Sequence, residues 1–289
     1  MNEYAFRFNN VSKRRHGYLS KVSFALPTGT IMALVGPNGA GKTTAIRALT
    51  GIAGFDEGEI TLFDHDVRAD IPKDKDNLSV VLDEIPYGDS FTAEQVEYIL
   101  AGVYSSWDTE QFHAYLRRFH LIPSKRIREY SIGMKQKLQL ACALSHDAKL
   151  LVLDEPLSDL DPASKEEVMD CIMQYMQPGD RSALITTNTP ADIDKYVDWV
   201  TILLSGSVAI SDERDRLLES YGILRCSKEE AETLTSPDIV LVRSNQYGAA
   251  ALVKNRDKVA AEYAGMTVDP ATIDDILIFY SIKGMGVVR

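Results

Sequence analysis

Apolar and polar positions along the chain form blocks that predict strands and helices in alternation. Short, almost wholly apolar runs are typical of buried strands, and they occupy residues 30–35, 78–82, 149–153, 182–187 and 199–204. Apolar residues at helical spacing predict helices at 45–50, 92–103, 109–120, 134–142, 162–175 and 190–196. Because strands alternate with helices, we expect an α/β core built on a mostly parallel sheet.

The beginning of the chain follows a different pattern. Residues 4–11 and 19–26 alternate between apolar and polar positions, which is typical of half-buried strands. A further short strand is predicted at 58–63. We expect these segments to form an antiparallel β subdomain beside the core sheet.

The character of the chain changes again after about residue 215. A hairpin signal at 239–253 and a final helix at 271–282 predict a small α+β appendage. We therefore divide the chain into a core domain over 1–215, with a helical subdomain at about 88–147, and a C-terminal domain over 216–289.

Composition narrows the class of protein. The chain has 289 residues, of which 45% are hydrophobic and 25% charged, as is usual for a soluble globular protein. The formal net charge of -11 disfavours nucleic acid as a partner, because nucleic-acid binders usually present a basic face. Three widely spaced cysteines are expected to be reduced thiols. No signal peptide opens the chain, and no apolar run approaches the ~20 residues that span a bilayer.

Residues Gly36 to Thr44 read Gly-Pro-Asn-Gly-Ala-Gly-Lys-Thr-Thr and fit the phosphate-loop pattern G-x-x-x-x-G-K-[ST]. A predicted strand precedes this loop and a predicted helix follows it, as the motif requires. The glycines let backbone N–H groups point inward as an anion nest, toward which the positive end of the helix is directed. Lys42 can then reach the β- and γ-phosphates, and the Thr43 hydroxyl can hold Mg²⁺. The nucleoside triphosphate site is thus expected to comprise Asn38, Gly39, Ala40, Gly41, Lys42, Thr43 and Thr44.

Two acids follow the apolar run at 149–153, at the carboxyl end of a predicted strand. In open α/β sheets ligands bind beyond the carboxyl ends of the strands, so we expect these acids at the same edge as the phosphate loop. Asp154 can hold Mg²⁺ through water, and Glu155 can accept a proton from the attacking water. The pair therefore predicts hydrolysis of the bound nucleotide.

With these residues the chain resembles the ATP-binding subunits of ABC transporters over residues 1–215. Gly36–Thr44 stands at the place of the family's Walker A loop, and Leu150–Glu155 at that of Walker B. Tyr130–Met134 stands where the family has its Leu-Ser-Gly-Gly-Gln signature, and Ser158–Asp161 where it has the D-loop. The signature residues and the C-terminal appendage are similar to those of ATPases of ABC-2-type exporters.

The resemblance implies a P-loop NTPase fold, ATP and Mg²⁺ as cofactors, and a head-to-tail dimer with a second ATP-binding subunit, identical or different. Each ATP would lie between Lys42 of one subunit and the partner's Ser131 and the partner's Gly133. Integral membrane permease subunits of the ABC-2 type, carried on separate chains, would respond to closure of this dimer. The protein would then be cytoplasmic and peripheral, held on the inner face of the cell membrane through the permease.

Several positions depart from the family pattern. Asp83 stands at the Q-loop position in place of glutamine, where an acid can still approach Mg²⁺ or water. Ile132 and Met134 replace a glycine and a glutamine of the signature. Asn188 stands at the place of the switch histidine, and asparagine can hydrogen-bond but cannot carry a charge. The resemblance thus gives three catalytic candidates, Glu155, Asn188 and Asp83, and three metal-ligand candidates, Thr43, Asp154 and Asp83.

Two questions stay open at this point. The aromatic platform for adenine is either Tyr18, which we favour, or His16. The leading function is an ATP-hydrolysing motor subunit of an exporter. The alternatives are a slowly hydrolysing or non-hydrolysing ATP-responsive subunit of an asymmetric pair, which Asn188 favours, and a soluble ABC ATPase of translation or DNA repair, which the acidic balance disfavours.

Overall fold

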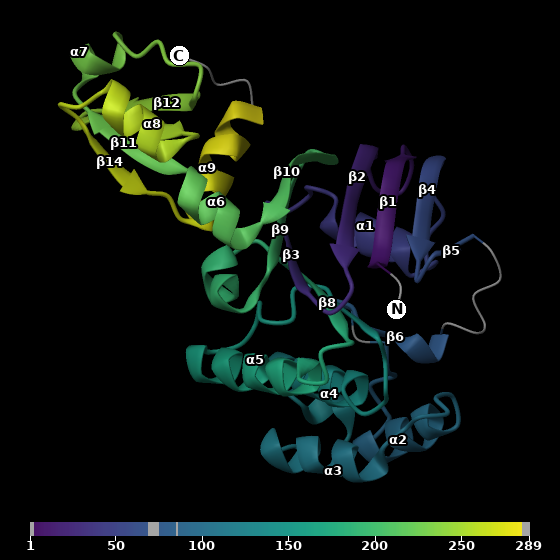
Figure 1. Ribbon diagram of the computed structural model, residues 1–289. Coiled ribbons are helices and arrows are strands. Elements are labelled where there is room, and N and C mark those ends of the chain that lie inside the picture. Colours follow the sequence, from purple (N-terminus) through teal and green to yellow (C-terminus); the bar gives the residue numbers. More distant parts are fainter. Residues whose placement is uncertain (1–2, 69–74, 85, 285–289) are drawn as a thin grey trace.

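The computed structural model describes residues 3–68, 75–84 and 86–284. Figure 1 shows a core sheet near the middle of the molecule, a smaller sheet beside it, a layer of helices below and a separate sheet at the C-terminal end. No helix within the described residues is long and apolar enough to cross a lipid bilayer.

Six strands form the core sheet in the order β10-β9-β3-β8-β7-β6. Their bounds are β3 Ile31–Val35, β6 Leu78–Val81, β7 Leu150–Leu153, β8 Ser182–Thr187, β9 Trp199–Leu204 and β10 Ser207–Glu213. The strands from β9 to β6 run parallel, and β10 pairs antiparallel with β9 at one edge. Every residue of β3 and β7 is buried, as their unbroken apolar runs predict. The expected α/β core with a mostly parallel sheet is confirmed.

The antiparallel sheet has the order β2-β1-β4-β5. Its bounds are β1 Tyr4–Lys13, β2 Leu19–Pro27, β4 Glu57–Leu62 and β5 His65–Asp66. Helix α1 (Lys42–Leu49) packs between this sheet and the core sheet, because its Ile46 is buried in one apolar cluster with Phe6 of β1 and Met32 of β3. Burial of each such side chain contributes about 1.5–3 kcal/mol, so the helix that follows the phosphate loop is held from both sides.

The helices on the other face of the core sheet are α2 Ala93–Ala101, α3 Thr109–Arg118, α4 Ile132–Ala143 and α5 Pro162–Met176, with 3-10 turns η1 Lys75–Asn77 and η2 Ile127–Glu129. Thr92 caps α2 through a capping box with Gln95, which agrees with the predicted helix start. Asp161 caps α5 and Pro162 occupies its first turn. Leu138 of α4 and Ile172 of α5 are buried in one apolar cluster with Val35 of β3, so these helices cover the sheet.

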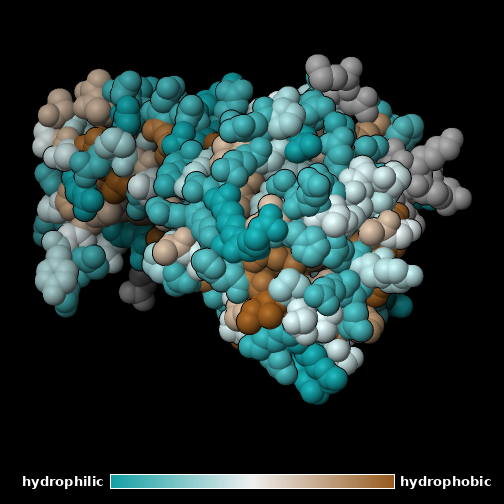
Figure 2. All heavy atoms as spheres, turned by 90° about the horizontal axis from the view of Figure 1, so that it is seen from below, coloured by the Kyte–Doolittle hydropathy of each residue, from teal (hydrophilic) through white to brown (hydrophobic). Residues whose placement is uncertain are grey.

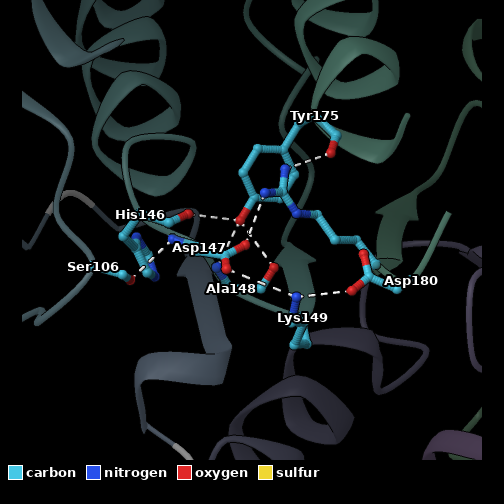
Figure 3. A network of polar contacts seen from close by, with 8 residues as sticks. Ser106, His146, Asp147, Ala148, Lys149, Tyr175 and Asp180 are labelled. Atoms are coloured by element: carbon cyan, nitrogen blue, oxygen red, sulfur yellow. Dashed lines mark hydrogen bonds and ion pairs between the residues drawn. The ribbon is translucent and has the colours of Figure 1, made fainter. Parts of the chain in front are cut away.

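A network of polar contacts fixes the starts of β7 and β8, as Figure 3 shows. The Tyr175 hydroxyl accepts the Ala148 N–H at 2.8 Å and lies 2.8 Å from the carbonyl oxygen of His146. Arg181 donates to Asp147 at 2.8 Å, and Lys149 donates to Asp180 at 2.9 Å. These contacts tie the end of α5 to two neighbouring strands whose opposite ends carry the acids and Asn188.

The short helix expected over 190–196 is two 3-10 turns, η3 Pro190–Asp192 and η4 Asp194–Tyr196. Between them, Ile193 adopts φ -130 and buries its side chain in the core, leaving it 1% exposed. Tertiary packing of this one side chain therefore outweighs the local preference for a continuous turn of helix.

The C-terminal part comprises α6 Arg214–Ser220, β11 Gly222–Cys226, α7 Lys228–Ala231, β12 Ile239–Asn245, β13 Gly248–Val253, α8 Arg256–Glu262, β14 Thr267–Pro270 and α9 Ile273–Gly284. The expected hairpin and final helix are present, and the sheet has the order β12-β13-β11-β14. Residue 215, our predicted boundary, lies within α6, and residues 285–289 lie outside the described residues. Ile273 and Ile276 of α9 are buried in one cluster with Ile202 of β9, so this part packs on the core.

Candidate functional site

The phosphate loop connects β3 to α1 (Lys42–Leu49) in a strand–loop–helix unit. Gly39 and Gly41 have φ values of 78° and 109°, in the left-handed region that favours glycine. At Gly36 a Cβ atom would lie 2.3 Å from the carbonyl oxygen of Leu203, so the close approach of the chain leaves no room for a side chain. α1 begins at Lys42, earlier than the predicted residue 45, because the loop leads directly into the helix without an intervening turn.

Lys42 is the buried cation of the loop, with 5% of its side chain exposed. Its Nζ donates to the carbonyl oxygen of Gly36 at 2.7 Å and lies 3.1 Å from Oε1 of Glu155. An unpaired buried ammonium group is costly, so these two oxygens stabilise its charge at a place where phosphate oxygens could replace them.

A cavity of about 410 Å³ brings the predicted nucleotide residues together. It is lined by Gly17, Tyr18, Asn38, Gly39, Ala40, Gly41, Lys42, Thr43, Thr44, Asp83, Asp154 and Glu155. All of these except Gly17 are predicted from the sequence. The phosphate loop and both acids therefore meet at one edge of the sheet, as expected for ligands at the carboxyl ends of parallel strands.

The two acids at the end of β7 share one hydroxyl group of β8. The Thr186 hydroxyl donates to Oδ1 of Asp154 at 2.6 Å and accepts the backbone N–H of Glu155 at 2.9 Å. Asp154 is 2% exposed, and its Oδ2 has no hydrogen-bond partner among the described residues. A buried carboxylate oxygen without a partner is a suitable position for a cation or its bound water.

Asp83 follows β6 and lines the same cavity. Partial burial raises the pKa of the Asp83 carboxyl, and the nearby carboxylates of Asp154 and Glu155 raise it further. Such a concentration of negative charge attracts a divalent cation. Within the described ranges no three or more His, Cys, Asp or Glu side chains form a metal-binding group by themselves. The unpartnered Oδ2 of Asp154 and the Thr43 hydroxyl, which line the same cavity, are oxygen donors of the kind that Mg²⁺ takes as ligands, so the residues present fit that ion.

Asn188 follows β8 but does not line the main cavity. Its Nδ2 donates to Oδ1 of Asn38 at 3.2 Å. It lines a second cavity of about 130 Å³ that also contacts Glu155, Ser158, Lys165 and Asp192. Asn188 therefore contacts the phosphate loop through Asn38, and it shares the second cavity with Glu155, which belongs to the walls of both cavities.

Ser131 and Gly133 lie at the start of α4 and line neither cavity. Ser131 is exposed, and its hydroxyl caps the helix by accepting the Met134 N–H at 3.2 Å. A Cβ atom at Gly133 would lie 3.1 Å from Leu160 and 3.4 Å from the carbonyl oxygen of Asp159. Within one chain the signature residues are thus separate from the phosphate loop.

The two aromatic candidates for adenine differ in position. Tyr18 lines the cavity, is 55% exposed and packs on the turn at Gly206, where a Cβ atom would lie 2.4 Å from its ring. His16 is exposed and is not among the residues that line the cavity. The geometry therefore agrees better with Tyr18.

Sequence reasoning missed Thr186, Gly17 and Lys165. Thr186 is 0% exposed within the apolar run of β8, and a polar residue in such a run was the available signal for a buried hydrogen bond. Nothing in the sequence pattern indicates that Lys165 of α5 contacts the segment after Asn188.

Comparisons with known proteins identify the family of the chain. The family model described as ABC transporter matches residues 19–158. The ABC transporter ATP-binding protein YtrB of Bacillus subtilis is 30% identical over 203 residues, which cover 70% of this chain and 69% of YtrB. The lantibiotic transport ATP-binding protein SrtF of Streptococcus pyogenes is 29% identical over 203 residues, which cover 68% of this chain and 85% of SrtF.

Solved structures show the same fold. A structure described as the ATP-binding subunit of an ABC transporter has a TM-score of 0.67 and 24% identity, and the match covers 74% of this chain and 91% of that one. A dimeric ATP-binding cassette in a post-hydrolysis state, bound to ADP and Pi, has a TM-score of 0.65 and 19% identity, covering 72% of this chain and 98% of the cassette. With its phosphate loop, paired acids and signature segment in family order, the chain belongs to the ATP-binding subunits of ABC transporters.

Proposed function

We propose that this protein is the ATP-hydrolysing motor subunit of an ABC exporter, which dimerises on ATP and drives a separate membrane permease. The observation that carries the proposal is the position of Glu155 at the wall of the nucleotide cavity, 3.1 Å from the buried Lys42 and next to Asp154. The names of relatives support the transport role. They include proteins for bacitracin transport in Enterococcus faecalis and Nod factor export in Sinorhizobium fredii.

The geometry suggests how the residues act. The phosphate loop would bind the phosphates through its inward N–H groups and the start of α1. Lys42 would exchange the oxygens of Gly36 and Glu155 for phosphate oxygens, which leaves the Glu155 carboxylate free to accept a proton from water. When bound, Mg²⁺ supplies neutralisation of the phosphate charge. Thr43, Asp154 and Asp83 are the residues that would hold it.

The position of the signature residues supports a dimer. Ser131 and Gly133 do not line the nucleotide cavity of their own chain. They can therefore contact a bound phosphate only when Lys42 of another subunit holds it. The start of α4 would then direct its N–H groups toward that phosphate. The second subunit is either another copy of this chain or a different ATP-binding subunit.

A permease surface is supported by the helical layer below the core sheet, within the proposed helical subdomain at 88–147. Large apolar side chains are exposed there, at Phe91, Tyr98, Ile99, Val103 and Ile122. Figure 2, which views the molecule from this end, shows apolar side chains gathered in a patch with polar residues around it. Contiguous exposed apolar surface is typical of protein interaction sites. We propose that ABC-2-type permease subunits bind here and hold the protein at the inner face of the cell membrane.

A slowly hydrolysing subunit of an asymmetric pair is the second candidate. It is favoured by Asn188, whose amide is engaged with Asn38 and carries no charge. Both candidates share the nucleotide cavity and differ in the rate of turnover.

The test is phosphate release from Mg-ATP by the purified chain, compared with Glu155→Gln. Because a general base typically contributes about 10²–10⁴-fold, turnover should fall by about that factor while ATP binding persists. Equal turnover in both proteins would contradict the role of Glu155. Turnover only on addition of a second, different ATP-binding subunit would favour the asymmetric pair.

Dimerisation is tested with Ser131→Asp. Aspartate is as good a helix cap as serine, so α4 should stay folded, but its charge would oppose the partner's phosphates. We expect ATP to bind the single subunit normally and the ATP-dependent dimer of Glu155→Gln, measured by light scattering, to be lost. Ser131→Asn is the neutral control that keeps the cap, and a persistent dimer in Ser131→Asp would contradict the arrangement.

A further inference from the structure

The C-terminal helix touches the segment that follows Asn188. We call residues 188–193 the switch segment; they comprise Asn188, Thr189, the 3-10 turn η3 and Ile193. α9 lies against η3 and against β9. In its first turn the Asp274 carboxylate lies near the backbone N–H of Ala191, which favours the charged form of the carboxylate and counteracts the rise in its pKa. Figure 1 shows α9 at the junction between the C-terminal sheet and the core.

Apolar packing reinforces this contact. Ile193 of the switch segment and Ile273 and Ile276 of α9 are each no more than 1% exposed and belong to the same buried cluster. Because interiors are close-packed, a displacement of the first turn of α9 would be felt by the switch segment.

A second contact holds the switch segment from the other side. Nζ of Lys165, on α5, lies 2.6 Å from Oδ2 of Asp192, and about a quarter of each side chain is exposed (26% and 25%). Lys165, Asp192, Asn188 and Glu155 all line the cavity of about 130 Å³. The ion pair is therefore part of the wall of the cavity that Asn188 shares with the candidate base.

The use of a carboxylate, that of Asp274, at the contact between α9 and η3 carries a cost in folding free energy. The carboxylate is half-buried, and burial raises the pKa of Asp274, as do the nearby carboxylates of Asp194, Asp275 and Asp192. An amide would place an uncharged oxygen near the same N–H at lower cost. Residues that oppose stability in this way are expected where position matters for function.

We propose that the C-terminal domain sets the rate of ATP hydrolysis, because Asp274 and Lys165 act as positioning residues that hold the switch segment, and with it Asn188, against Glu155. This regulation rests on the proposed ATPase function. It makes the C-terminal domain a positive effector of the site: a ligand or partner that moved α9 would slow hydrolysis without occupying the nucleotide cavity.

The experiment uses the full chain and three variants. Asp274→Ala removes the acceptor, Asp274→Asn keeps an amide oxygen in its place, and Asp257→Ala is the control. Asp257 is a carboxylate of the same domain on α8 whose side chain is 94% exposed. We measure kcat and KM for ATP, and separately the hydrogen exchange of the backbone amides of residues 191–194 in the nucleotide-free protein.

We expect Asp274→Ala to lower kcat by about tenfold, a typical coupling between sites, with KM unchanged and with faster exchange in the switch segment. The kcat of Asp274→Asn should stay within about twofold of the wild-type value, because the amide keeps an acceptor oxygen. Asp257→Ala should match the wild type in both kcat and hydrogen exchange. Lys165→Met should lower kcat in the same way as Asp274→Ala.

Other outcomes overturn the proposal. Unchanged exchange in Asp274→Ala would show that Asp274 does not hold the segment, whatever the turnover. Faster exchange with unchanged kcat would show that the held position does not matter for hydrolysis. If the wild type itself hydrolyses no ATP, the proposed function fails, and the exchange measurement still decides whether the contact exists.

Discussion

The phosphate loop and the switch segment line different cavities that share Glu155 as a common wall, and they are held in different ways. The loop is fixed by its own backbone and by neighbouring main chain: the Gly36 N–H donates to Thr187 at 3.3 Å, and the Gly206 N–H donates to Ala40 at 2.8 Å. The switch segment exposes Asn188 and depends on side chains from distant helices, Lys165 and Asp274.

The difference separates binding from turnover. A site fixed by backbone hydrogen bonds tolerates side-chain changes elsewhere, because its contacts do not depend on the side chains of distant residues. A segment held by long-range side-chain contacts responds to whatever moves those side chains. We therefore expect substitutions on one side of Glu155 to change nucleotide affinity and those on the other side to change the rate.

The largest effect is expected for Lys42→Ala. Hydrogen bonds to charged groups contribute about 1.5–3 kcal/mol, so ATP affinity should fall about 10- to 100-fold. Titration with a fluorescent ATP analogue measures this. Arg47→Ala, on the same helix but outside the cavity lining, is the matched control. Equal affinity of Lys42→Ala and the wild type would refute the binding role of the loop.

A smaller effect, on the opposite side, is expected for Asn188→His. An imidazole can carry charge and exchange protons where the amide cannot, so kcat should rise by about tenfold with little change in KM. Asn245→His, at the exposed C-terminal hairpin, is the control for adding a histidine. A change confined to KM would show that Asn188 acts in nucleotide binding, as the phosphate loop does, and would contradict the proposed separation between binding and turnover.

The smallest effect concerns stability. Because the pKa of Asp274 is raised in the folded protein, folding favours the protonated form, and stability is lost as pH rises through that pKa. Asp274→Asn has no charge to bury, so it should be more stable than the wild type at neutral pH. The difference should shrink toward about pH 4, near the ordinary aspartate pKa. Urea unfolding at both pH values measures it, and an equal difference at each would exclude ionisation as the cause.

The sequence predicted the phosphate-loop side well for a physical reason. The apolar runs of β3 and β7 leave no doubt about two buried parallel strands, and the motif between Gly36 and Thr44 determines the loop locally. The cavity that unites Lys42, Asp154 and Glu155 then follows from the rule that ligands bind at carboxyl ends of strands.

The other side could not be predicted in the same way. β10 alternates between exposed and half-buried positions and has no buried side chain, and its pairing with β9 makes it a strand. The break at Ile193 and the contacts of Lys165 and Asp274 arise from elements far apart in the sequence, for which periodicity carries no signal. The family resemblance supplied a role for Asn188 but not what holds it.

The backbone of Glu155 has a φ of 49°, in the left-handed region that a residue with a long side chain occupies only at a cost. Glycine, or to a lesser degree asparagine, would adopt that conformation more readily. Selection for thermostability alone would thus favour replacing the very residue proposed to activate water. Thermostable variants obtained by directed evolution should therefore be tested for ATP turnover whenever they carry a substitution of Glu155. At this residue, stability and activity favour different amino acids.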